Sequence, residues 1–116
     1  MHEYSIVQAL MGQVERTVRQ HANGRTPTVH RLHVAIGELS GVEIPLLRTA
    51  YDTFRERTLC ARAELEVHEV SAEWTCPACS RTIPRGTRLA CPDCGQPARL
   101  TQGDEIVLQR IEMEVP

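Results

Sequence analysis

The chain is poor in aromatic residues, in charge of one sign and in long apolar runs. Aromatic side chains make up 3% of its 116 residues, so few rings are available for stacking on nucleic-acid bases. The 13 basic and 15 acidic residues give a net charge of -2, which argues against broad binding to nucleic acid or an anionic membrane. No run is long enough to cross a bilayer, and no secretion signal opens the chain. We therefore expect a cytoplasmic protein with an aliphatic core, whose partners are neither nucleic acid nor membrane.

Hydrophobic periodicity predicts an α+β fold. Residues 4–22 carry apolar side chains at helical spacing, and a second helix is expected to run from Pro45 to about Arg57. Residues 28–36 and 62–70 alternate between apolar and polar side chains, which is typical of strands. A third strand is expected over 105–115. Three strands with two helices on one face make a small α+β domain.

Two local signals refine these elements. Ser40 and Glu43 have the spacing of a capping box, and Pro45 suits a first helical turn, so these residues are expected to form the start of the second helix. In the last strand the apolar phase shifts between Leu108 and Ile111, which predicts a bulge or a change of face near Gln109.

Four of the five cysteines form two Cys-Pro-x-Cys pairs. A reducing compartment makes metal binding or catalysis a better explanation for them than disulfides. Each short turn can present two thiolates to one ion, and a proline stiffens both turns at the same place. The ligands are expected to be Cys76, Cys79, Cys91 and Cys94. We expect an inserted zinc-ribbon-like module at 73–99, and an α+β domain built from 1–72 and 100–116.

A closed four-cysteine zinc site is structural. Four thiolates leave no position for water or substrate, so we do not expect an enzyme. Iron in a rubredoxin-like, all-cysteine site is the more specific alternative. Such electron-transfer sites are usually surrounded by aromatic residues, whereas this loop has only the adjacent Trp74. The fifth cysteine, Cys60, is expected to be buried and inert, with a reactive thiol or an extra metal contact as the minority interpretation. The arginines of the loop are expected to be solvated, or else to face an acidic partner; they are Arg81, Arg85 and Arg88.

The amino terminus carries a second possible metal site. His2 offers an imidazole, with its own amide nitrogen and the α-amine of Met1 within chelating reach. Amide nitrogen donors suit Ni(II) or Cu(II) more than zinc. The plainer interpretation is a disordered surface histidine, with Glu3 as a favourable charge at a helix start. The other histidines form no second ligand pattern, and His30, His33 and His68 are expected to be structural or on the surface.

The chain resembles the HypA/HybF family of nickel-delivery accessory proteins for [NiFe]-hydrogenase maturation. The resemblance covers essentially the whole chain in the same order. It rests on MHEYS at the terminus, GELSGVE at 37–43, AELEV at 63–67, the paired CPxC turns and the closing GDEIVLQRIEMEV.

The resemblance implies roles for individual residues. His2 matches the essential nickel ligand, with backbone nitrogens of Met1-His2-Glu3 completing the site, and Glu3 matches a position that tunes the nickel site or partner contacts. The four cysteines match the zinc ligands, while Glu43 stands where an acidic residue near the nickel is plausible. Some relatives carry histidines beside the zinc cysteines; this chain carries none there.

The implied function is nickel delivery, with structural Zn(II) and transient Ni(II). The implied partners are a nickel-loading GTPase accessory protein and the hydrogenase large subunit precursor. This chain lacks a phosphate-binding loop, so nucleotide chemistry would have to come from the GTPase. Two alternatives stay open: a zinc-ribbon adaptor or nucleic-acid-binding module without nickel function, and an iron electron carrier.

Overall fold

The computed structural model describes residues 2–116, so Met1, one of the expected nickel ligands, lies outside the described residues. The chain divides into two compact units. The first consists of Met1–Ala35, Val42–His68 and Val107–Pro116, and the second of Ile36–Gly41 and Glu69–Ile106. Across residues 2–116, no helix is both long and apolar enough to cross a membrane.

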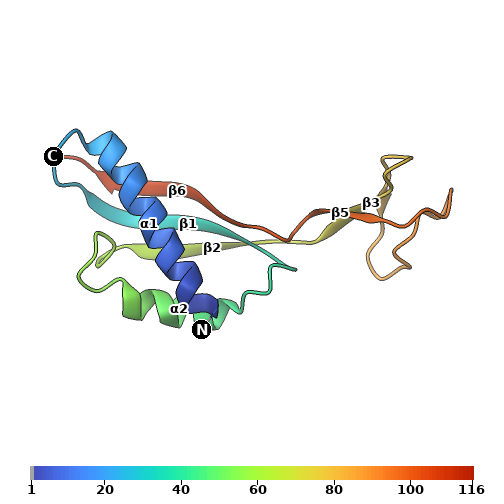
Figure 1. The fold of residues 1–116 in the computed structure, drawn as a ribbon, viewed down its shortest axis with the longest axis horizontal. Coiled ribbons are helices and arrows are strands. Elements are labelled where there is room, and N and C mark those ends of the chain that lie inside the picture. The colour runs from blue at the N-terminus through green and yellow to red at the C-terminus, as the bar shows by residue number, and fades with distance from the viewer. Residues whose placement is uncertain (1) are drawn as a thin grey trace. The chain divides into compact units, whose positions relative to one another are not determined.

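A long helix covers a three-stranded sheet in the first unit. Helix α1 spans His2–Ala22, and the sheet has the order β2-β1-β6, from β1 (Thr28–Gly37), β2 (Glu64–Val70) and β6 (Ile106–Glu114). Figure 1 shows α1 lying across these strands. The buried core residues of α1 and β1 are Val7, Leu10, Met11, Val14, Val18, Val29, Leu32 and Val34. The predicted α+β fold is confirmed, because the helical and alternating patterns each bury one face.

Helix α2 spans Ile44–Phe54 and packs against α1. It buries Leu47, Ala50 and Tyr51, and the Tyr51 hydroxyl donates a hydrogen bond of 2.7 Å to the carbonyl of Ala63. That bond satisfies the polar end of a buried ring, so the loop after α2 is held against the helix.

The predicted capping box of α2 is wrong, whereas Pro45 lies in the first turn of the helix as expected. The N-cap residue is Glu43, without a side-chain capping bond, so Ser40 does not begin the helix. The amide of Ser40 instead donates to the carbonyl of Gly37 in a turn, and Gly41 follows with a φ of 81°. At the other end the helix stops at Phe54, three residues before the predicted Arg57. Arg57 has a φ of 64°, and this left-handed conformation cannot continue an α-helix.

The second unit contains a small sheet of short strands, β3 (Glu73–Thr75), β4 (Thr82–Ile83) and β5 (Arg99–Gln102), in the order β4-β3-β5. Trp74 lies opposite Ile83 on one side and Leu100 on the other. Strands of two to four residues are too short to show a period, which is why the sequence did not predict them.

Two glycines let three backbone segments meet in the second unit. A Cβ atom on Gly37 would lie 2.3 Å from the carbonyl of Gly103, and one on Gly103 would lie 2.6 Å from Cα of Ala72. The amide of Leu39 donates to the carbonyl of Gly103 at 2.7 Å, and that of Glu38 donates to Val70 at 2.8 Å. Neither glycine can therefore carry a side chain without moving backbone.

The carboxylate of Glu38 stabilises the place where these three backbone segments meet. Oε1 accepts hydrogen bonds from the amide of Ala72 and from Arg85 Nη1, while Oε2 accepts from Arg85 Nη2 at 2.8 Å. The paired guanidinium, followed by the Ala72 amide, lowers the pKa of Glu38 to about 2. A carboxyl with a lowered folded-state pKa stabilises the fold above its unfolded value of 4.5 and loses that contribution as the pH falls towards 2.

Replacing Arg85 by alanine is expected to raise the pKa of Glu38 towards 4.5, because the largest cause of its depression is removed. The measurement is a titration of the Glu38 side-chain carboxyl carbon by NMR. Arg88→Ala is the matched control, since it removes the same charge from the same loop. A Glu38 midpoint that stays near 2 in Arg85→Ala would contradict the pairing.

Candidate metal sites

The two cysteine turns of the second unit have the same backbone design. In the first turn the amide of Ser80 donates to the carbonyl of Cys76, and in the second Gly95 donates to Cys91, both at 2.9 Å. The amide of Cys76 donates to the carbonyl of Arg81, and the amide of Cys91 donates to the carbonyl of Gln96, both at 2.8 Å. The two turns therefore have the same hydrogen-bond pattern.

The closing residue of each turn is left-handed. Gly95 has a φ of 75°, and the equivalent Ser80 has a φ of 57°. The left-handed conformation of Ser80 was not predicted, because serine seldom adopts it. The signal available was positional: Ser80 follows Cys79 as Gly95 follows Cys94.

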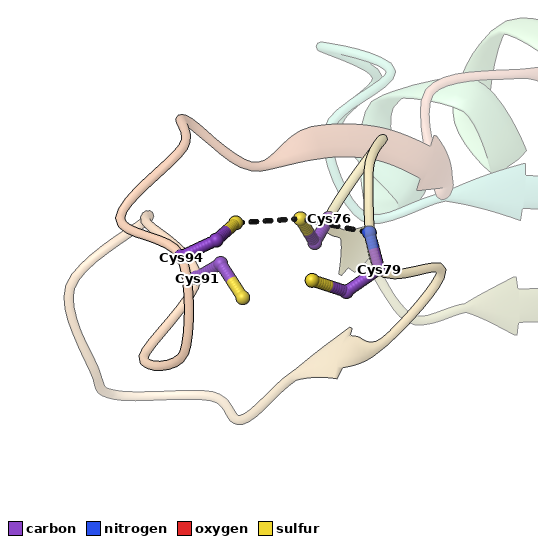
Figure 2. Close-up of side chains that lie close together, drawn as sticks. All are labelled: Cys76, Cys79, Cys91 and Cys94. Carbon is purple, nitrogen blue, oxygen red and sulfur yellow. Dashed lines mark hydrogen bonds between the residues drawn. The ribbon is translucent and has the colours of Figure 1, made fainter.

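The turns bring four sulfur atoms together, as Figure 2 shows. The ligand atoms of the four cysteines all lie within 4.8 Å of one another, and Sγ of Cys76 and Cys94 are 3.5 Å apart. A tetrahedral zinc ion with bonds of about 2.3 Å separates its sulfurs by about 3.8 Å. The donor set and its spacing therefore fit Zn(II). In the described part of the chain, this is the one group of three or more metal-binding side chains that converge.

Hydrogen bonding favours the thiolate form of one of these cysteines, which is the form that binds a cation. The Cys79 amide donates to Cys76 Sγ at 3.3 Å, and this bond is the largest cause that lowers the pKa of Cys76 to about 7. The adjacent sulfurs, Cys94 first, raise the pKa of Cys79 to about 12. Thiolates this close repel one another, so all four ionise together only around a dication.

Little apolar packing supports this cluster. Cys76 and Cys91 are buried with Ile83, and Trp74 and Ala98 are partly buried against them. So small a core does not hold a loop of this length without a cross-link. A metal ion would therefore supply much of the folding free energy of this unit.

Two of the three loop arginines have carboxylate partners inside the second unit. Arg81 pairs with Asp93, which joins the two cysteine turns, and Arg85 pairs with Glu38. Arg81 and Arg85 are therefore exposed charges paired within this unit, which neither the solvated nor the acidic-partner interpretation predicted.

The amino terminus is anchored in the first unit by Glu3. His2 is the exposed first residue of α1, whereas Glu3 is only 9% exposed. Glu3 Oε2 accepts a hydrogen bond of 3.3 Å from the amide of Glu43, and this bond is the main cause that lowers the pKa of Glu3. Tyr4 adds an edge-to-face contact with Phe54 of α2. The start of α1 and the start of α2 are thus joined, and the Glu3–Glu43 contact was not predicted.

Cys60 stands apart from the cluster. It is fully buried in the first unit, and burial raises its pKa to about 11. It is a protonated thiol at neutral pH, without the thiolate character that reactivity or metal binding needs.

Known proteins resemble this chain along its whole length. A family model described as "Hydrogenase/urease nickel incorporation, metallochaperone, hypA" matches residues 1–113. The hydrogenase maturation factor HypA of Shewanella baltica strain OS185 is 36% identical, over 98% of this chain and 97% of its own length. That of Aquifex aeolicus is 34% identical, over 99% of both.

Solved structures agree with these relatives. The solution structure of the nickel metallochaperone HypA from Helicobacter pylori is 30% identical, covers 98% of both chains and superposes with a TM-score of 0.72. A second solution structure, of a HypA protein, is 31% identical, covers 100% of this chain and 98% of that one, and gives a TM-score of 0.78.

Proposed function

We propose, because this chain belongs to the HypA family of nickel-incorporation metallochaperones, that it binds Ni(II) at its amino terminus and delivers it during [NiFe]-hydrogenase maturation. The observation that carries this proposal is the match over residues 1–113, which includes the Met-His-Glu start. The accompanying zinc would be held by Cys76, Cys79, Cys91 and Cys94.

The nickel chemistry would centre on His2. Amide N–H groups in the first turn of a helix have no acceptor within the helix, and His2 lies in the first turn of α1. The positive end of the helix dipole also favours loss of an amide proton. In a protein that starts at Met1, the α-amine, a deprotonated amide nitrogen and the imidazole would form fused chelate rings, an arrangement that suits square-planar Ni(II).

Glu3 would support this site by position and charge. Its ionised carboxylate lies at the helix start and is held by the amide of Glu43. A negative charge there offsets the repulsion between the helix dipole and a cation. Glu43 would then contribute through its backbone, which fixes Glu3, and this role differs from a direct acidic ligand.

The zinc would be structural, and the protein a carrier without catalytic activity. The four sulfurs lie within 4.8 Å of one another, and together they would complete the tetrahedral shell of a zinc ion and leave no position for water or substrate. A terminal nickel site can open without unfolding the domain, which allows release. The partners would be a nickel-loading GTPase accessory protein and the hydrogenase large subunit precursor, and the place of action the cytoplasm.

Metal content tests the proposal. The untagged protein starting at Met1 is expected to retain about one zinc ion per chain after brief treatment with a chelator, because closed four-thiolate sites hold zinc tightly. Exposure to Ni(II) should add one nickel ion that the chelator removes. Elemental analysis and absorption spectra give both results. Zinc without nickel would indicate a zinc-ribbon adaptor, and a red protein containing iron would indicate an electron carrier.

A further inference from the structure

Two histidines from neighbouring strands face each other on the sheet of the first unit. Nδ1 of His33, on the central strand β1, lies 3.0 Å from Nε2 of His68, on β2. The ring centroids are 5.3 Å apart and the ring planes differ by 6°. On the other side of the His33 ring, Nε2 lies 2.5 Å from Oε2 of Glu112 on β6. One side chain from each strand of the sheet thus contributes to a continuous row of polar contacts, which consists of His68, His33 and Glu112.

We propose that this row holds a third metal site, in which His33 Nδ1 and His68 Nε2 bind one divalent ion that prefers imidazole, such as Ni(II), Zn(II), Co(II) or Cu(II). The site is separate from the terminal nickel site and from the four cysteines, and it does not depend on the proposed function.

The tautomer of His33 favours metal binding. Glu112 bears an ionised carboxylate, because hydrogen bonding from His33 and then from Arg110 lowers its pKa to about 2. A carboxylate only accepts, so it fixes the proton of His33 on Nε2 and leaves the lone pair of Nδ1 directed at His68. A carboxylate on the far nitrogen is the usual support of a metal-binding imidazole, which it orients and makes more basic.

The spacing of the two nitrogens also fits. Metal–nitrogen bonds of about 2.0–2.1 Å place neighbouring ligand nitrogens about 2.9–3.4 Å apart, depending on whether the angle at the metal is square or tetrahedral. The observed 3.0 Å lies in that range. Without metal, His68 Nε2 donates a hydrogen bond to the lone pair of His33 Nδ1, so the two rings are already positioned. Metal binding at His68 Nε2 requires that proton to leave this nitrogen, and exchange with solvent at the exposed His68 ring allows a proton to be taken up at its Nδ1 instead.

The surrounding charge favours a cation. Arg31 pairs with Glu64 and approaches Glu66, and Arg110 pairs with Glu112, while His30 approaches Glu114. In this group, four carboxylates outnumber two guanidinium groups. The His33 side chain is 14% exposed, which shields its ring, while His68 is exposed and leaves the open side of the site accessible to an incoming ion and to water ligands.

Two protein nitrogens make a weaker site than four cysteines. The ion would keep at least two exchangeable positions, which water occupies or a second ligand group can take. The expected behaviour is a low-affinity, rapidly exchanging metal equivalent beyond those of the other two sites.

The test uses the full chain, already loaded with zinc, in the His2→Ala background, so that the terminal site cannot respond. Zn(II) is added beyond the first equivalent, and the imidazole nitrogens are followed by NMR, with calorimetry for affinity. We expect shifts at His33 Nδ1 and His68 Nε2, while His33 Nε2 keeps its proton. Adding His68→Asn should weaken this extra binding at least tenfold.

His30→Asn is the matched control, because it removes an exposed imidazole from β1 and should leave the extra binding unchanged. His68 is exposed, so its replacement should keep the fold, and circular dichroism checks this. Equal binding in the His68→Asn protein, or unshifted nitrogens of His33 and His68 on adding Zn(II), would overturn the proposal and leave the row as a hydrogen-bond network only.

Discussion

Replacing Cys91 by serine is expected to remove zinc from the protein and to unfold the second unit around the cysteine turns. Cys91 is buried beside Cys76 and Ile83, so the change takes away a metal ligand and leaves a hydroxyl in an apolar cluster. With so few buried apolar side chains, binding energy and folding energy are largely the same quantity in this unit. In the presence of a chelator, zinc content should fall from about one ion per chain to near zero, measured by elemental analysis. The amide spectrum of β3–β5 should lose its dispersion.

Cys60→Ser is the matched control for this experiment. It is the same substitution at another fully buried cysteine, in the first unit and away from the four sulfurs. Zinc content should stay unchanged there, whatever the cost in stability. A Cys91→Ser protein that keeps its zinc and the dispersion of β3–β5 would contradict the four-cysteine site.

The long elements could be predicted from the sequence because their core pattern is local. Helix α1 and strands β1, β2 and β6 show their period along most of their length, and the apolar positions of that period are buried or half-buried. In β6, Leu108 and Ile111 are half-buried while Gln109 and Arg110 between them are exposed, which follows the phase shift in the sequence. The N-cap of α2 could not be predicted in this way, because Ser40 lies in the turn before Gly41 and Glu43 becomes the N-cap residue instead.

The metal-binding residues divide in the same way. The spacing of the four cysteines alone predicts that they lie close together, since each pair lies within one turn. The contact between Glu3 and Glu43, by contrast, joins residues 40 positions apart, and the one between His33 and His68 joins residues 35 positions apart. The sequence placed both histidines on wet strand faces but could not show that β2 lies beside β1, in a register that brings their rings together.

Extending the amino terminus is expected to abolish nickel binding as completely as His2→Ala, although it leaves the imidazole intact. A glycine-serine extension before Met1 converts the α-amine into an ordinary amide and adds chain where the ion should sit. A chelate that requires the amine and an amide nitrogen loses its geometry, and affinity should fall at least 100-fold, or about 2.7 kcal/mol. Calorimetry of zinc-loaded protein, with the extension and after its cleavage to Met1, measures the change.

The same glycine-serine segment placed after Pro116 is the control, because it adds equal length and leaves the α-amine free. That protein should bind nickel as the untagged one does, and both should lose affinity as the pH falls through about 6.5, where a free histidine takes up a proton and ceases to be a ligand. His2→Ala should keep its zinc and helical signal, since His2 is exposed and lies outside the core. Equal nickel affinity with and without the amino-terminal extension would rule out the amine as a ligand. The search for the remaining ligands would then turn from the amine to carboxylates, first Glu3 and Glu43, which are joined at the starts of α1 and α2.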